Sequence, residues 1–208
     1  MPTGIAAAIV ILGVAVAMFF NPLWIGFEQE RAGVPAITGW TSEEVQAATN
    51  SILADLFVGP SSFSVAVNGQ AVLDAAERSH MVDVRNVVLP ATLVFASALV
   101  LLATLFVTSR RQAWFWRAMA LGSGALTIVG VVVGIAVLFF FDEAFLLFHL
   151  VFFPQGNFSF DPRTQRLTQL LPDQFWTETA IGTAVVGLLI AAVVTVVAHR
   201  QAGLVGGR

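Results

Sequence analysis

Long apolar stretches that hold no charged residue alternate with polar segments along the 208-residue chain. Four of them, residues 1–27, 86–109, 118–141 and 179–199, lack Asp, Glu, Lys and Arg. A helix needs about 20 apolar residues to cross a bilayer. The pattern therefore predicts transmembrane helices at about residues 4–27, 86–109, 116–141 and 177–199 of a single membrane domain, 1–208. The first stretch has no basic residues ahead of it and is too long for the core of a signal peptide, so we interpret it as a membrane anchor.

Basic and acidic residues lie on opposite sides of these predicted helices. All ten basic residues are arginines, and five of them lie between the second and third spans or in the C-terminal tail, where there is no acid. The other two connections, 28–85 and 142–178, hold all 13 acids and the remaining five arginines, which makes −8 against +5. Basic residues gather in cytoplasmic loops. Both termini are therefore expected in the cytoplasm, and residues 28–85 and 142–176 are expected outside.

The first outer segment carries signals for local structure. Thr41-Ser42-Glu43-Glu44 is a capping box that predicts a helix to about Leu56. Asn68-Gly69 predicts a tight hairpin between strands 63–67 and 70–73. Asp74 and Glu77 repeat the capping pattern and begin a helix that carries His80 to the membrane.

The second outer segment predicts two short helices. Residues 144–153 are apolar except for His149 and are too few to span, which favours a helix in the membrane interface. Asp161-Pro162 predicts the start of a helix that ends near Pro172. The fold class expected is an all-α membrane protein, with four transmembrane helices and an extracellular α/β cap formed by the two outer segments.

The amino-acid composition excludes several classes of function and kinds of active site. With 57% hydrophobic and 11% charged residues, a soluble enzyme is disfavoured, and a net charge of −3 gives no basic surface for nucleic acid. The absence of Cys excludes thiol nucleophiles and thiolate metal sites. No tight ligand spacing such as HExxH appears, so the sequence predicts no metal and no cofactor.

The candidate site is the histidine pair His80 and His149, because both fall in segments expected at the outer membrane face. Imidazole exchanges protons near neutral pH. On a helix, Glu77 and Asp83 share a face with His80, so a carboxylate there could hold the tautomer of the ring. Alternatively, each histidine is an amphipathic interfacial residue with its polar edge in water. Phenylalanines around His149, including Phe148 and Phe152, could line a pocket for acyl chains or pack the cap onto the spans.

Two sequence runs resemble the bacterial lipoprotein intramolecular transacylase (Lit) family. They are Ser-His-Met-Val-Asp-Val-Arg at 79–85 and Phe-His-Leu-Val-Phe-Phe-Pro-Gln-Gly-Asn-Phe-Ser-Phe-Asp-Pro at 148–162, with Leu-Leu-Pro-Asp at 170–173. The resemblance implies an extracellular cap on four helices and catalysis by His80 and His149. It also implies transfer of the sn-2 acyl chain of a diacylglyceryl lipoprotein to the α-amine of its own N-terminal cysteine. The product would be a lyso-form lipoprotein.

For such a reaction, Asn157 and Arg85 could donate hydrogen bonds to the oxyanion or carbonyl. Asn157 could instead shape the turn after Pro154, and Arg85 could instead anchor its span at the headgroups. The expected location is the bacterial cell membrane, with membrane lipids and a lipoprotein substrate as partners. Two other functions fit the same residues: a membrane esterase or lipase in which the histidines activate water, and a non-catalytic lipid-binding assembly factor. A solute pathway is disfavoured because no charged residue lies inside a span.

Overall fold

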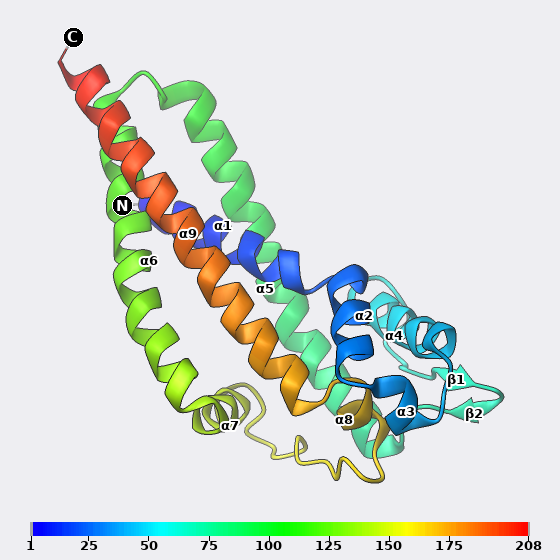
Figure 1. The fold of residues 1–208 in the computed structure, drawn as a ribbon. Coiled ribbons are helices and arrows are strands. Elements are labelled where there is room, and N and C mark those ends of the chain that lie inside the picture. Colours follow the sequence, from blue (N-terminus) through cyan, green and yellow to red (C-terminus); the bar gives the residue numbers. More distant parts are fainter. Residues whose placement is uncertain (1, 208) are drawn as a thin grey trace. The chain divides into compact units, whose positions relative to one another are not determined.

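The computed structural model describes residues 2–207, which divide into two compact units. One unit holds the described residues up to Met18, residues 91–139 and the chain from Ala180 onward; the other holds 19–90 and 140–179. We call the first the membrane unit and the second, after the side on which the sequence leads us to expect it, the outer unit. The elements, labelled in Figure 1, are α1 (Pro2–Phe19), α2 (Pro22–Arg31), α3 (Val34–Thr38), α4 (Ser42–Phe57), β1 (Ala66–Val67), β2 (Gln70–Ala71), α5 (Ala75–Ser109), α6 (Ala113–Phe139), α7 (Phe141–Phe152), α8 (Arg166–Leu170) and α9 (Asp173–Gly206).

Helices α1, α5, α6 and α9 are long and apolar enough to cross a membrane. The C-terminal end predicted for the first span, at residue 27, is wrong, because α1 ends at Phe19. Asn21 begins a new helix there: its side chain accepts hydrogen bonds from the backbone N–H groups of Leu23 and Trp24, and Pro22 occupies the first helical position. An Asn-Pro pair inside an apolar run therefore ends the span.

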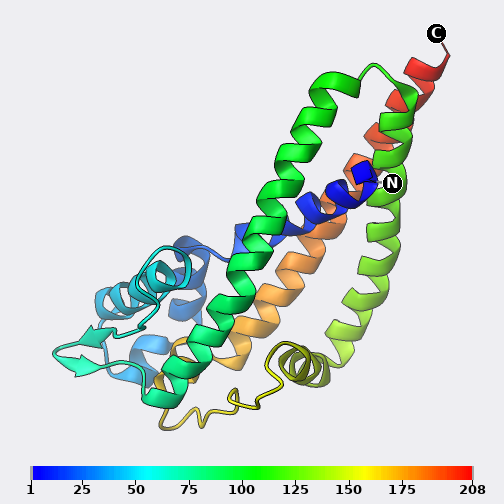
Figure 2. The same cartoon turned by 180° about the vertical axis from the view of Figure 1, so that it is seen from behind.

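Glycines let the helices of the membrane unit approach closely, with α1 crossing its neighbours obliquely (Figures 1 and 2). A Cβ atom on Gly4 would lie 2.7 Å from the carbonyl oxygen of Ala118, and one on Gly122 would overlap the Gly4 backbone. On Gly130 it would lie 3.0 Å from Leu188. Gly122 and Gly130 are therefore positions at which a larger residue would push neighbouring helices apart.

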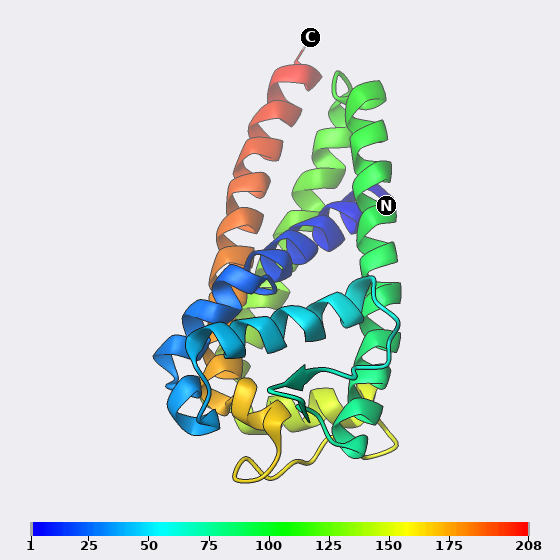
Figure 3. The ribbon, with the colours of Figure 1, turned by 90° about the vertical axis from the view of Figure 1, so that its right-hand side faces the viewer.

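The outer unit has a hydrophobic core built on one face of α4. Val45, Ala48, Ile52 and Leu56 recur at helical spacing and pack with Phe63 and the hairpin residues, which lie beside α4 in Figure 3. Both capping boxes are confirmed. Thr41 and Glu44 exchange side-chain to backbone hydrogen bonds, as do Asp74 and Glu77.

Two predicted elements differ in extent. The hairpin forms around Asn68-Gly69 but has only two residues in each strand, because Ser61 and Phe63 take left-handed backbone conformations before the first strand. The helix predicted from Asp161 begins at Arg166 instead. The Asp161 carboxylate accepts a hydrogen bond from the backbone N–H of Arg163, so it forms a turn and does not cap a helix.

A buried carboxyl joins α2 to the start of α9 in the outer unit. Glu28 is fully buried, and Arg31 binds both Glu28, at 2.9 Å, and Glu178. Trp24 Nε1 adds a hydrogen bond of 2.9 Å to Thr179 Oγ1. Burial raises the pKa of Glu28, and so does the neighbouring Glu178 carboxyl, whereas Arg31 opposes both effects.

We expect Arg31→Met to lower the melting temperature of the detergent-solubilised protein at pH 8, because it leaves the buried Glu28 carboxyl without its cation. A carboxyl whose pKa is raised in the fold favours folding at low pH and loses that contribution as pH rises. The loss of stability in Arg31→Met should therefore be smaller at pH 5, and Glu28→Gln in the Arg31→Met background should restore stability at pH 8. Arg163→Met is the control, because Arg163 pairs with Asp161 at the surface. Equal losses at both pH values would contradict the prediction.

Candidate active site

Contacts near the N-terminal end of α5 fix the position of His80. The buried Glu77 carboxylate closes the capping box with Asp74 through one oxygen. Its other oxygen accepts a hydrogen bond of 2.7 Å from the backbone N–H of Leu167 in α8. His80 lies one turn further along and is 6% exposed. The same carboxylate thus caps the helix that carries His80 and ties it to the second outer segment.

His149 lies on α7, and its tautomer follows from its hydrogen bond. The ring Nδ1 is 2.8 Å from the carbonyl oxygen of Phe145, which can only accept, so Nδ1 carries the proton. In the neutral ring, the lone pair is then on Nε2.

The two histidine rings face one another. Their centroids are 6.1 Å apart and their planes are inclined by 23°. Residues 69 positions apart in the sequence are thus brought into one stacked pair within the outer unit.

Aromatic side chains surround this pair. Phe153 is buried and contacts both imidazole rings: its ring centroid lies 4.8 Å from that of His80 and 5.6 Å from that of His149. Phe160 contacts His80, and Phe145 and Phe158 contact His149. Sequence reasoning counted these residues in an aromatic cluster without assigning them to the site. The two that it did assign lie further out: Phe148 contacts His149, and Phe152 contacts Phe148 with tilted ring planes; both are about half exposed.

Asp83 binds two amides. Its Oδ2 accepts hydrogen bonds from Asn157 Nδ2 at 2.6 Å and from Gln155 Nε2 at 2.8 Å. Among the described residues, the structure gives no hydrogen bond from the His80 ring to either carboxylate: Glu77 binds backbone N–H groups, and Asp83 Oδ2 binds the two amides. Gln155 was not identified from the sequence. It follows Pro154 in a turn, and only its hydrogen bond to the distant Asp83 shows that it belongs to the site.

Arg85 lies two residues beyond Asp83 on α5. Its guanidinium donates a hydrogen bond to the backbone carbonyl of Asp55, near the end of α4. This contact joins two helices of the outer unit. It fits the structural role considered for Arg85 better than the role of a donor to a reacting group.

His80 is in the charged initial part of α5, before the charge-free stretch begins at Asn86. Burial lowers the pKa of His80 to about 4, and the neighbouring His149 acts in the same direction. The Asp83 charge and hydrogen bonding to the Asn157 amide raise the pKa, but by less. His80 is thus a neutral imidazole at physiological pH.

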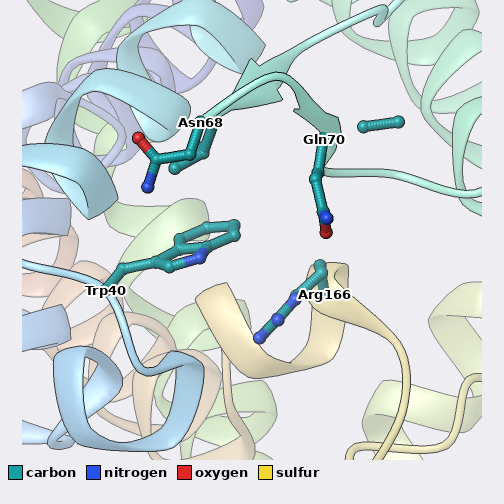
Figure 4. Close-up of a pocket in the computed structure, with 6 residues that line it drawn as sticks. Trp40, Asn68, Gln70 and Arg166 are labelled. Atoms are coloured by element: carbon teal, nitrogen blue, oxygen red, sulfur yellow. The ribbon is translucent and has the colours of Figure 1, made fainter.

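A hollow of about 210 Å³ elsewhere in the outer unit is shown in Figure 4. Trp40, Asn68, Gln70 and Arg166 line it, and the Arg166 guanidinium lies 4.8 Å from the centre of the Trp40 ring. The Arg166 guanidinium also donates hydrogen bonds to the Thr38 carbonyl and to the Gln169 side chain, so it already has partners within the protein. None of the histidine-pair residues lines this hollow.

Together, the long apolar helices and the histidine pair define a small helical membrane protein with two imidazoles set among aromatic side chains. The family model for lipoprotein intramolecular transacylase Lit matches residues 2–176. The chain therefore belongs to the Lit family. It is a multi-pass membrane protein of the lipoprotein-modifying acyltransferase class.

Solved structures agree with this assignment at the level of the fold. The membrane-integral lipoprotein intramolecular transacylase Lit from Bacillus cereus is 16% identical, with a TM-score of 0.78, over 96% of this chain and 92% of that one. A form of that protein with a histidine-to-arginine substitution is 17% identical, with a TM-score of 0.70, over 96% and 88%. A third, with histidine replaced by alanine, has the same identity and TM-score over 96% and 90%. No curated protein matches the chain by sequence.

The low pKa of His80 predicts a distinct titration. In ¹³C-histidine NMR spectra of the solubilised protein, the His80 signal should stay unshifted from pH 8 to 5.5 and begin to move only as the pH approaches 4. Since the unfolded chain takes up the proton near pH 6.5, acidification from there toward pH 4 should also favour unfolding, by up to about 3 kcal/mol.

The chain has three histidines, so His149→Gln and His199→Gln assign the spectrum. His149→Gln should also raise the His80 midpoint, because the electrostatic interaction with His149 lowers the pKa of His80, whereas His199→Gln should leave it unchanged. A His80 midpoint near 6.5 in the unaltered protein would show that the ring is not desolvated.

Proposed function

We propose that the protein moves the sn-2 acyl chain of a lipoprotein's diacylglyceryl group onto the α-amine of the same N-terminal cysteine. The single observation that carries this proposal is the stacked His80–His149 pair among phenylalanines, in a chain of the Lit family. The substrate brings its own nucleophile, which agrees with a site built from imidazoles alone.

The reaction needs a confined substrate. Counting from the amine nitrogen through Cα, Cβ, sulfur, two glyceryl carbons and the ester oxygen to the acyl carbon gives an eight-membered ring. Such a ring closes poorly in a flexible lipid. Apolar walls that hold the amine near the ester could contribute up to about 7–11 kcal/mol through orientation. Phe153, which touches both histidines, and the half-exposed Phe148 and Phe152 suit that task.

The histidines handle the proton. The new N–C bond forms as the C–O bond to the glyceryl group breaks, and the amine proton ends on the glyceryl oxygen, so no water is consumed. Stacked imidazoles disfavour a second charge, as the effect of His149 on the pKa of His80 indicates. Beyond the one N–H that each neutral ring has, the pair therefore takes up at most one additional proton. His149, with its lone pair on Nε2, takes the amine proton and delivers it to the glyceryl oxygen, while the neutral His80 accepts a hydrogen bond from the reacting amine.

Incubation with a synthetic diacylglyceryl lipopeptide that has a free amine should give an N-acyl, lyso-glyceryl product of unchanged mass and altered fragmentation. His80→Ala and His149→Ala should each lower the rate by about 10²–10⁴-fold, because each removes a proton-handling group. His199→Gln is the matched control and should keep the rate. Release of free fatty acid would instead identify a hydrolase, and binding without turnover would identify a lipid-binding factor.

The proposal also gives the protein an orientation in the membrane, with both termini in the cytoplasm and the histidine pair at the outer face. Because the native chain has no cysteine, single cysteines can report it. In intact cells, a membrane-impermeant maleimide should label Ser62→Cys and leave Arg111→Cys unlabelled until the cells are permeabilised. The reverse pattern would contradict the orientation that the arginines predict.

A further inference from the structure

Two buried polar atoms beside the histidine pair have no hydrogen-bond partner within residues 2–207. They are Nδ1 of His80 and Oδ1 of Asn157. An unpaired buried polar atom costs free energy, so such atoms call for an explanation. One of the two can carry a proton and the other can only accept one.

Asp83 determines how the Asn157 amide is turned. A carboxylate accepts hydrogen bonds and does not donate them, so the Asn157 atom 2.6 Å from Asp83 Oδ2 must be the NH₂ group. The flipped amide would set two acceptors against each other. The carbonyl oxygen of Asn157 is therefore directed away from Asp83 and is buried without a donor.

The His80 ring is the neighbour that can supply this donor. The Asn157 amide adjoins it, because hydrogen bonding to that amide is among the effects that raise the pKa of His80. A protonated Nδ1 would satisfy both unpaired atoms in one contact. The neutral ring would then hold its lone pair on Nε2, as His149 does through its bond to the Phe145 carbonyl.

We propose that Asp83 and Asn157 act as positioning residues: the Asp83 carboxylate orients the Asn157 amide, whose oxygen accepts a hydrogen bond from His80 Nδ1–H. This relay keeps His80 in the Nδ1–H tautomer. An amide sets the tautomer without placing a full negative charge against the ring, and so leaves His80 neutral. The catalytic value of the relay, though not its existence, rests on the transacylase function proposed above.

The tautomer can be measured without activity. In ¹⁵N-histidine-labelled protein in micelles, long-range ¹H–¹⁵N correlation spectra distinguish the two ring nitrogens of His80, assigned with His80→Gln. The unaltered protein should show a protonated Nδ1. Asn157→Leu, which keeps the bulk and removes the acceptor, should move the population toward the Nε2–H form, and Asp83→Asn should move it partly.

Gln155→Leu is the matched control. The Gln155 amide binds the same Asp83 oxygen as Asn157 does, but it is neither of the two groups that hold the unpaired atoms, His80 Nδ1 and Asn157 Oδ1. This variant should leave the His80 tautomer unchanged. An Nε2–H tautomer in the unaltered protein, or an unchanged tautomer in Asn157→Leu, would overturn the relay.

Measurements of transacylase activity then test whether the relay contributes to catalysis. Asn157→Leu should lower kcat for the lipopeptide at least tenfold with little change in KM. Asn157→Asp places a carboxylate against the ring and should move the acid limb of the kcat profile to higher pH, a shift that a merely structural role would not produce. If the tautomer shifts as expected but no variant transfers acyl groups, the relay stands and the proposed function fails. Loss of activity in Asn157→Leu with the tautomer unchanged would make Asn157 a direct donor to the substrate and overturn the positioning role.

Discussion

The Glu77 carboxylate is the contact on which the arrangement of the outer unit depends. It caps α5 through the Asp74 backbone and binds the backbone N–H of Leu167 in α8, while remaining 2% exposed. Because His80 lies one turn beyond Glu77, the same bonds that begin the helix also set the depth of the ring. Asp83, one turn further on, binds Gln155 and Asn157 and so holds the loop that follows His149. Two carboxylates on one helix thus join the two outer segments.

Burial of His80 sets the protonation state of one member of the histidine pair. Imidazole in water is partly charged near neutral pH, but the aromatic surroundings of His80 and the proximity of His149 lower its pKa to about 4. A neutral ring keeps a nitrogen lone pair available to a hydrogen-bond donor. A lipid ester and a neutral amine both suit such apolar surroundings.

Local signals in the sequence predicted much of this fold. Charge-free stretches marked the four apolar helices, and the capping boxes at Thr41 and Asp74 have the expected bonds. Errors arose where a short polar signal competed with a longer pattern: Asn21-Pro22 ends α1 within an apolar run, and Asp161 forms a turn. Contacts between distant residues were beyond local reasoning. Spacing on α5 suggested that a carboxylate faces His80, but the Asp83 carboxylate binds Gln155 and Asn157, which lie 72 and 74 residues further along the chain.

The central claim is that the two histidines act as one unit on one proton. Single-turnover rates of lipopeptide transacylation in His80→Ala, His149→Ala and the double variant test it most directly. Groups that act together lose their effect together, so the double variant should be no slower than the slower single variant, within about threefold. If the two losses instead multiply, the histidines act independently, and the claim that they act as one unit is contradicted.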